Sequence, residues 1–280
     1  MFVVRSIEKL KEMLDGFRRE GSIGFVPTMG ALHEGHISLI EKSVEENKFT
    51  IASVFVNPTQ FNDKNDLKNY PRTEENDFAM LENAKCDVVF APSVEEVYPE
   101  PDTRVFDFGS LETVMEGATR PGHFNGVAQV VSKLFDYVEP DNAYFGEKDF
   151  QQVAIIKQMC KDLALKVNII ACEIKRDVDG LALSSRNMLL SAEEREIAPV
   201  IYMTLKEAIN RAKWDTVEGT KKWVIEQLDS NDMMKSIYFE LVNSETLQSV
   251  ESWDDADDIQ GCIAVQLGNI RLIDNINFKK

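Results

Sequence analysis

Two of the three histidines in the chain stand three residues apart in the stretch IGFVPTMGALHEGHISLI, residues 23–40. His33 and His36 follow an apolar run and a Pro-Thr-Met-Gly turn, and Gly30 and Gly35 allow the backbone to approach a ligand closely. A helix that begins near His36 presents free N–H groups and a positive dipole end, which suit an anion. Imidazoles there can donate hydrogen bonds to phosphate oxygens. The stretch indicates phosphate chemistry, and two surface histidines in a turn are the alternative.

Metal chemistry fits these residues poorly. The zinc-protease pattern needs His, Glu and His at a different spacing on a formed helix, and the only further histidine available as a third ligand is His123. The cysteines show no metal-ligand spacing and lie in or near apolar segments; they are Cys86, Cys160, Cys172 and Cys262. We expect buried, reduced thiols at these four positions.

Composition limits the classes of partner. The 280 residues are 44% apolar and 28% charged, as in globular proteins of one large domain or two ordinary ones. Apolar runs are too short to span a membrane, and the N-terminus lacks signal-peptide features, which predicts a cytoplasmic protein without a membrane partner. A net charge of −17 disfavours nucleic acid as a partner. A site for a polyanion such as ATP must therefore gather its few cations locally.

The first two-thirds of the chain alternates strand and helix patterns. Apolar runs predict strands over 22–28, 50–57, 86–93, 142–149 and 166–175, the fourth running into a loop, and helical periodicity predicts helices over 35–48, 73–84, 126–138 and 150–165. This alternation is typical of an α/β fold, a Rossmann-like doubly wound parallel sheet. Ligands on such sheets bind beyond the carboxyl ends of the strands, where the strand order reverses.

The pattern changes near residue 175. Ser191 and Glu194 have capping-box spacing at the start of a helix predicted over 191–212, and a second helix is predicted over 216–228. Alternating segments predict half-buried strands within 236–243 and 261–274, and the acidic segment 251–258 is predicted to be a solvated loop. We therefore predict two domains, a nucleotide- and pantoate-binding domain over 1–175 and a smaller α+β lid domain over 176–280, the ligands of the first being those implied below.

Seven stretches carry a resemblance to a known family: PTMGALHEGH, VFVNPTQF, YPRT, RPGHFNGVAQVVSKLF, YFGEKDFQQ, DGLALSSRN and RLIDN, in this order between Phe25 and Asn275. The histidine stretch resembles the HIGH-type motif of the nucleotidyltransferase superfamily, and the whole set is similar to the pantothenate synthetase (pantoate–β-alanine ligase) family. The resemblance implies that the carboxylate of (R)-pantoate attacks the α-phosphorus of ATP, and that β-alanine then attacks pantoyl adenylate to release AMP.

The resemblance also implies the site residues. His33, His36, Lys148 and Arg186 would be catalytic, with His36 as general acid toward the departing pyrophosphate. The implied ATP-binding residues are Met29, Gly30, Ala31, Leu32, His33, Glu34, Gly35, His36, Gly146, Glu147, Lys148, Asp149, Lys175 (through its backbone), Leu183, Ser184, Ser185 and Arg186. Gln60 and Gln152 would bind pantoate, because amides both donate and accept hydrogen bonds, and Gln60 would border the β-alanine site.

Three further expectations follow from the resemblance. The polar segment 61–73 would be a gate that keeps water from the adenylate. Mg2+ would be held mainly by ATP phosphates, with Asp77 as the candidate protein ligand, although Asn76 interrupts the acidic run there. The chain would form a homodimer through its larger domain. His123, beside Arg120 and Asn125, belongs either to the site or to a structural turn.

Alternatives to the ligase remain open. A nucleotidyltransferase of the same superfamily would stop after nucleotide transfer, but the two glutamines and the C-terminal segment with LSSRN favour the ligase. A non-catalytic nucleotide-binding protein is disfavoured by the intact His33, His36, Lys148 and Arg186. A tRNA synthetase is disfavoured by the acidic charge and by the lack of a tRNA-sized extra domain.

Overall fold

The computed structural model describes residues 1–279, without the side chain of Lys279, and divides the chain into two compact units. The first unit contains Met1–Phe108, Arg120–Glu147 and Gln152–Glu173. The second contains Gly109–Thr119, Lys148–Gln151 and the chain from Ile174 onward. The last division lies beside the predicted domain border, whereas 109–119 and 148–151 join the second unit although the sequence placed them in the first domain.

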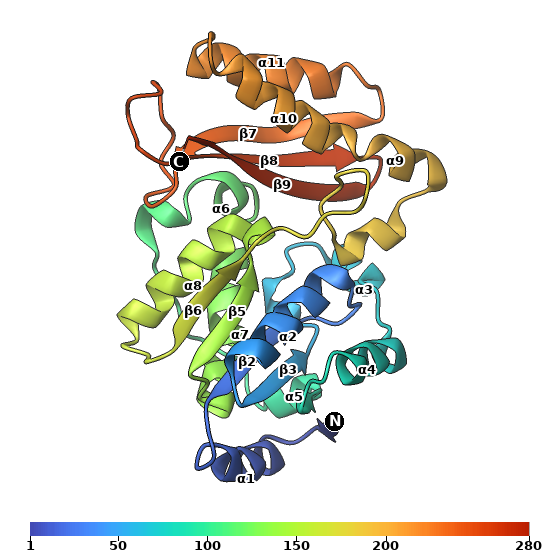
Figure 1. Cartoon of the computed structure of the whole chain (residues 1–280), viewed down its shortest axis with the longest axis vertical. Helices are drawn as coiled ribbons and strands as arrows, with labels where there is room; N and C mark the ends of the chain where they lie inside the picture. Colours follow the sequence, from blue (N-terminus) through green and yellow to red (C-terminus); the bar gives the residue numbers. More distant parts are fainter. Residues whose placement is uncertain (280) are drawn as a thin grey trace. The chain divides into compact units, whose positions relative to one another are not determined.

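The first unit is built on a six-stranded parallel sheet in the order β1-β4-β3-β2-β5-β6. Figure 1 labels β2, β3, β5 and β6 of this sheet. The strands are β1 (Phe2–Val4), β2 (Ile23–Thr28), β3 (Phe49–Val54), β4 (Val88–Phe90), β5 (Asn142–Gly146) and β6 (Asn168–Cys172). The predicted doubly wound parallel sheet is confirmed, and β1 is a strand that the sequence analysis missed. The chain order reverses beside β2, which has β3 on one side and β5 on the other.

Helices cover both faces of this sheet. They are α1 (Ile7–Phe17), α2 (Glu34–Glu46), α4 (Glu74–Asn83), α7 (His123–Val138) and α8 (Phe150–Asp162), with short α3 (Lys64–Asn69) and α5 (Val94–Val97). Neighbouring residues of β2 face opposite sides: Val26 joins a core cluster with Ile40 of α2 and Leu81 of α4, while Phe25 packs edge-to-face on Phe135 of α7. Both faces of β2 are therefore buried, which leaves its carboxyl end as the part that can meet a ligand.

The second unit contains an antiparallel sheet of β7 (Met234–Asn243), β8 (Ile259–Leu267) and β9 (Ile270–Lys279). Helices α10 (Val200–Arg211) and α11 (Val217–Asp229) lie against it (Figure 1), and α9 (Ala192–Ile197) and α6 (Met115–Thr119) are short. The predicted α+β composition and the capping box of Ser191 with Glu194 are confirmed. The single helix predicted over 191–212 is wrong, because Pro199 separates α9 from α10. The strand predicted over 261–274 is a hairpin that turns at Gly268, where φ is +54°.

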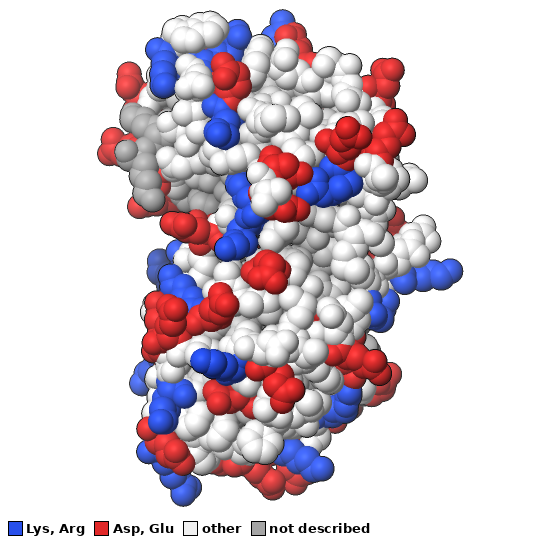
Figure 2. All heavy atoms as spheres, turned by 45° about the vertical axis from the view of Figure 1, so that its right-hand side comes forward, with Lys and Arg blue, Asp and Glu red and all other residues white. Residues whose placement is uncertain are grey.

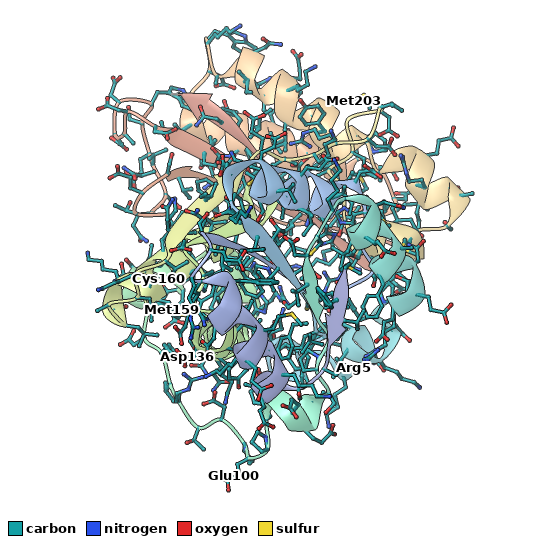
Figure 3. The ribbon with its side chains drawn as sticks, turned by 60° about the horizontal axis from the view of Figure 1, so that its bottom comes forward. Arg5, Glu100, Asp136, Met159, Cys160 and Met203 are labelled. Atoms are coloured by element: carbon teal, nitrogen blue, oxygen red, sulfur yellow. The ribbon has the colours of Figure 1, made fainter. Side chains whose placement is uncertain are left out.

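The surface and the cysteines agree with the bulk properties. Acidic side chains are spread among lysines and arginines over the face drawn in Figure 2. Within residues 1–279, no helix is long and apolar enough to cross a membrane. All four cysteines are free and buried, as predicted. Burial raises the pKa of Cys86 to about 12 and that of Cys160, which follows Met159 on α8 (Figure 3), to about 11.

Candidate active site

A tight turn joins β2 to α2 at the point where the strand order reverses. Gly30 has φ +76° and Ala31 has φ +49°, so two successive residues adopt the left-handed conformation. Asp77 of α4 holds this turn: its carboxylate oxygens accept hydrogen bonds from the backbone nitrogens of Ala31 at 2.9 Å and Leu32 at 2.8 Å, and Thr73 Oγ1 donates a third at 2.9 Å. Asp77 is 1% exposed. A buried carboxylate therefore fixes the direction in which the chain enters the histidine stretch.

The two histidines cap the first turn of α2. His33 Nδ1 accepts a hydrogen bond from the backbone of Gly35 at 3.1 Å, and His36 Nδ1 accepts one from the backbone of His33 at 3.3 Å. The ring centroids lie 4.1 Å apart. Because each Nδ1 accepts a hydrogen bond from a backbone N–H, each neutral ring carries its own proton on Nε2. The pair can therefore donate hydrogen bonds from Nε2 beside the N-terminus of a helix, where an anion is favoured.

Gln60 lies close to this turn and its amide is oriented by neighbours. Asn57 Nδ2 donates to Gln60 Oε1 at 3.1 Å and to the Gly126 carbonyl at 3.1 Å, while Asn57 Oδ1 accepts from the Tyr98 hydroxyl at 2.9 Å. Gln60 Nε2 is thereby turned toward Met29 Sδ, at 3.2 Å. Sulfur is a weak acceptor, so a carboxylate or hydroxyl oxygen would be a better partner for this N–H.

His123 supports Gln60 from behind. Its Nδ1 lies 2.8 Å from the Gln60 carbonyl, and its Nε2 lies 3.1 Å from Arg120 Nη1. The carbonyl only accepts and the guanidinium only donates, so Nδ1 carries the proton and Nε2 accepts. Gly126, one turn further along α7, lets the helix approach: a Cβ there would lie 2.7 Å from Gln60 Cα. Of the two roles left open for His123, these contacts favour the structural one.

In the second unit, a small hairpin precedes the LSSR stretch. Leu183 N donates to the Lys175 carbonyl at 3.0 Å, and the turn passes through Gly180, where φ is +94°. Arg176 in this hairpin binds both carboxylate oxygens of Asp274 on β9, at 2.6 and 2.8 Å, and lies 3.8 Å from the centroid of the Tyr202 ring. Burial raises the pKa of Asp274, and the Arg176 guanidinium opposes that shift. The hairpin is thus anchored to the C-terminal sheet.

The predicted cationic residues of the second unit lie on two short turns. Ser184 Oγ caps a 3-10 turn over 185–189 by accepting from the Arg186 backbone at 3.3 Å. Lys148 lies on the 3-10 turn over 147–149, with its ammonium 3.6 Å from Asp149. The Lys148 carbonyl accepts a hydrogen bond from Asn275 Nδ2 at 3.0 Å. Both turns therefore have backbone or capping contacts that fix where their side chains begin.

The predicted gate segment contains a short helix. In α3, Asp63 Oδ1 caps the first turn by accepting from the backbone of Asn65 at 2.7 Å. Arg72 closes the segment on itself, because its guanidinium donates to the carbonyls of Tyr70 at 3.0 Å and Leu67 at 3.2 Å. These contacts are short-range, and the opening and closing of the segment stay a prediction.

The structure brings some predicted residues together within a unit. Met29 to His36 form one turn, Gln60 reaches Met29, and Gly146 and Glu147 lie at the carboxyl end of β5, the neighbour of β2. Gln152 lies half-buried in the first turns of α8. The neighbouring Gln151 is buried, and the Gln151 amide binds the backbone of residues 111, 114 and 116. In the second unit, Lys148 and the hairpin before Leu183–Arg186 both bind β9.

Sequence reasoning missed three residues that support the site. Asn57 stands in the quoted VFVNPTQF stretch, and its place before Pro58, at the cap of a 3-10 turn, was an available signal. Asn275 stands in the quoted RLIDN stretch without an assigned role. Tyr98, 41 residues from Asn57, gave no sequence signal, because only the fold brings its hydroxyl to the Asn57 amide.

Comparison with known proteins finds relatives that match the chain over its whole length. The family model described as pantoate-beta-alanine ligase matches residues 2–277. Proteins named pantothenate synthetase from Porphyromonas gingivalis and Bacteroides thetaiotaomicron are 56% and 55% identical, over 100% of both chains in each pair.

Two solved structures are similar to this chain over almost its whole length. A pantothenate synthetase from Thermus thermophilus superposes with a TM-score of 0.93 at 42% identity, over 100% of both chains. A pantoate-beta-alanine ligase from Francisella tularensis, complexed with beta-gamma ATP and beta-alanine, gives 0.84 at 37% identity, over 99% of this chain and 98% of that one. The doubly wound sheet, the capped histidine pair at its switch point and these full-length matches together place the chain in the pantoate–β-alanine ligase family.

Proposed function

We propose that this chain condenses (R)-pantoate with β-alanine at the expense of ATP, through pantoyl adenylate, in the two steps that the family resemblance implies. A pantoate carboxylate oxygen bonds to the α-phosphorus as the bond to the departing pyrophosphate breaks. The nitrogen of the neutral β-alanine amine then bonds to the acyl carbon and gives up one proton, and AMP leaves with the electron pair of the broken C–O bond. The observation that carries the proposal is the pair of Nε2 donors that His33 and His36 present at the N-terminus of α2.

The charges of the chemistry explain this use of histidine. Negative charge builds on the leaving pyrophosphate, and preorganised donors in a site that excludes water stabilise such charge. His33 and His36 are already held by their Nδ1 contacts, so no reorientation is needed when charge develops. The general-acid role of His36 stays a prediction, and hydrogen-bond donation from its Nε2 supports the same stabilisation. Lys148 would add the positive charge of a mobile ammonium at the phosphates, and Arg186 would add that of a planar guanidinium.

The oriented amide of Gln60 supports the pantoate role. Asn57 occupies Gln60 Oε1, so Nε2 is the end available to a substrate oxygen. Gln152 would bind the same substrate from α8, and Gln60 would border β-alanine. We expect orientation to be the main contribution of the site to the reaction of the two small substrates, since holding reactants in line can lower the activation barrier by roughly 7–11 kcal/mol.

Magnesium fits best as a companion of ATP. Among residues 1–279, no group of three His, Cys, Asp or Glu side chains is placed to hold a metal ion. Asp77 already accepts hydrogen bonds from the Gly30–Leu32 turn on both oxygens. We therefore propose that the ATP phosphates carry Mg2+, which neutralises part of their charge. The homodimer and the cytoplasmic location stay predictions, and the mass measured by light scattering tests the first.

One assay tests the proposal. The protein is incubated with ATP, magnesium, pantoate and β-alanine, and AMP is followed, with each small substrate omitted in turn. AMP release that needs both substrates is the expected result. If pyrophosphate is released and the amount of AMP does not depend on β-alanine, the protein is a nucleotidyltransferase. A folded sample without turnover would favour a non-catalytic nucleotide-binding protein.

A further inference from the structure

Two consecutive residues of β9 bind the two segments of the second unit that carry the proposed phosphate ligands. Asn275 is 3% exposed; its Nδ2 donates to the Lys148 carbonyl at 3.0 Å, and its Oδ1 accepts from Gln260 Nε2 at 2.7 Å. Asp274 is 5% exposed and binds Arg176 through both oxygens. A single strand therefore fixes both segments.

The contact with Arg176 reaches the LSSR stretch through the hairpin. Arg176 Nη1 also donates to the Gly180 carbonyl at 3.2 Å, and residues 176 and 182 form an antiparallel bridge directly before Leu183. Gly180 is close to the Tyr202 ring, because a Cβ there would lie 2.4 Å from Tyr202 Cδ1. The start of the LSSR stretch thus has its backbone position set by a buried ion pair and by close packing.

We propose that Asn275 is a positioning residue for Lys148, and that Asp274 is its counterpart for the hairpin before Leu183–Arg186. A lysine side chain has a flexible four-carbon stem, so the ammonium reaches a phosphate consistently only if the backbone that carries it is fixed. Asn275 supplies that fixed point at the Lys148 carbonyl. The inference rests on the proposed function for the role of Lys148.

The chain offers a matched control at Asn277. Asn277 lies two residues further along β9 and, like Asn275, binds the Gln260 side chain: its Nδ2 lies 3.3 Å from Gln260 Oε1. Its Nδ2 also donates to Asp258 instead of Lys148. Asn275→Ala and Asn277→Ala therefore both remove an asparagine bound to Gln260, and only the first releases Lys148.

The first measurement compares kcat, the KM for ATP and the dissociation constant of ATP in the two variants. Asn275→Ala is expected to lower kcat for pantoate-dependent pyrophosphate exchange and to weaken ATP binding. Together the two effects should lower kcat/KM for ATP by roughly 3- to 10-fold, the effect of one lost hydrogen bond. Asn277→Ala is expected to leave both values within about twofold. Equal losses in the two variants, or no loss in Asn275→Ala, would overturn the positioning role.

A double-mutant cycle separates positioning from general structural damage. If Asn275 acts through Lys148, Asn275→Ala costs little in a Lys148→Ala background, because the group being positioned is gone. The same fold-loss in both backgrounds would overturn the inference. If Asn275→Ala fails to fold, Asn275→Asp replaces it: it keeps the oxygen that accepts from Gln260 and loses the donor to Lys148, and Asn277→Asp controls for the added charge.

Two outcomes keep this inference distinct from the proposed function. Loss of ATP affinity in Asn275→Ala and not in Asn277→Ala supports the positioning role even if the wild-type chain forms no product with pantoate and β-alanine. A wild-type chain that binds no ATP would overturn both.

Discussion

Asn57 Nδ2 donates a hydrogen bond to Gln60 Oε1 at 3.1 Å, which decides which end of the Gln60 amide is available. Asn57 is itself oriented, because its Oδ1 accepts from Tyr98 OH at 2.9 Å and from Thr59 Oγ1 at 3.1 Å. An amide turned by 180° would present an acceptor where the proposed contact with pantoate needs a donor. Asn57 and Thr59 belong to the local motif, whereas Tyr98 lies 41 residues from Asn57, so the motif and the fold fix this choice together.

Tyr98→Phe is expected to raise the KM for pantoate by roughly 2- to 10-fold, the value of one hydrogen bond, with the KM for ATP nearly unchanged. The ring would remain to pack near Phe55 and Lys133. Steady-state kinetics at varied pantoate measures the effect. Tyr137→Phe is the control, since its ring packs on Phe90. A pantoate KM that is equal in Tyr98→Phe and wild type would refute the relay from Tyr98 to Gln60.

Gly126→Ala is expected to cost about 1–3 kcal/mol of stability and to raise the KM for pantoate, because the added methyl group meets the Thr59 carbonyl at 2.4 Å and the backbone of Gln60. Urea unfolding and kinetics measure the two effects. Gly16→Ala, near the end of α1, is the contrasting variant, since a Cβ added there would have no atom within 4 Å; it is expected to be neutral or to stabilise by up to about 1 kcal/mol. Similar effects in both would mean that close packing at Gly126 is unimportant.

Lys148→Ala is expected to leave the thermal midpoint within a few degrees of wild type. If Lys148 contacts the phosphates as proposed, the variant loses a positive charge there and forms the adenylate slower by orders of magnitude. Pyrophosphate exchange measures the first step alone. Lys157→Ala, an exposed lysine on α8, is the control and should exchange at the wild-type rate. Near-normal exchange by Lys148→Ala would remove Lys148 from the mechanism.

Asp77→Asn is expected to lower stability by about 1–3 kcal/mol and to reduce turnover, because an amide group cannot accept from both backbone nitrogens of the Gly30–Leu32 turn. If Asp77 only supports the turn, the Mg2+ concentration for half-maximal activity stays at the wild-type value. Glu75→Gln, exposed on the same helix, is the control. A large rise in the required Mg2+ for Asp77→Asn alone would identify Asp77 as a metal ligand.

Stability is expected to fall above pH 9 as thiols ionise in the unfolded chain. Burial raises the pKa of Cys160 to about 11 from its usual value near 9. Between these values the unfolded state has lost the thiol proton and the folded state keeps it, so the free energy of unfolding falls by about 1.4 kcal/mol per pH unit for each such cysteine. Below pH 9 the contribution is fully present. Urea unfolding from pH 8 to 10.5 should show a shallower decline in Cys160→Ala; identical slopes would contradict the shift.

Periodicity predicted the sheet of the first unit well, because its central strands are apolar on both faces and its helices have one apolar stripe. It failed where a single residue overrides the pattern. Pro199 lacks a backbone N–H and ends the helix that the pattern continues to 212. Gly268 permits the left-handed turn that divides the predicted strand 261–274 into β8 and β9. Strand β1 has only three residues, too few to show a period.

For the site, the sequence showed which residue types were present and the fold showed how they are held. The place of the histidine pair at the start of a helix was predictable, since its spacing and glycines are local features, and its role as an anion site stays a prediction. The Nδ1 contacts that leave Nε2 as the donor required coordinates. Asp77 was singled out from a run of acidic residues as a metal ligand, whereas its contacts with Ala31 and Leu32 cross 46 and 45 positions of sequence, which no local pattern reveals.

The β8–β9 hairpin limits which insertions its turn can accept in protein engineering. Asp274 and Asn275 are neighbours on a strand, so their side chains project from opposite faces. A one-residue insertion between Gly268 and Ile270 that shifted β9 by one position would exchange those faces and strip Arg176 and Lys148 of their partners together. An insertion absorbed wholly by the turn would not. Loop grafting at this tip is therefore governed by whether the strand slides, rather than by how much is added.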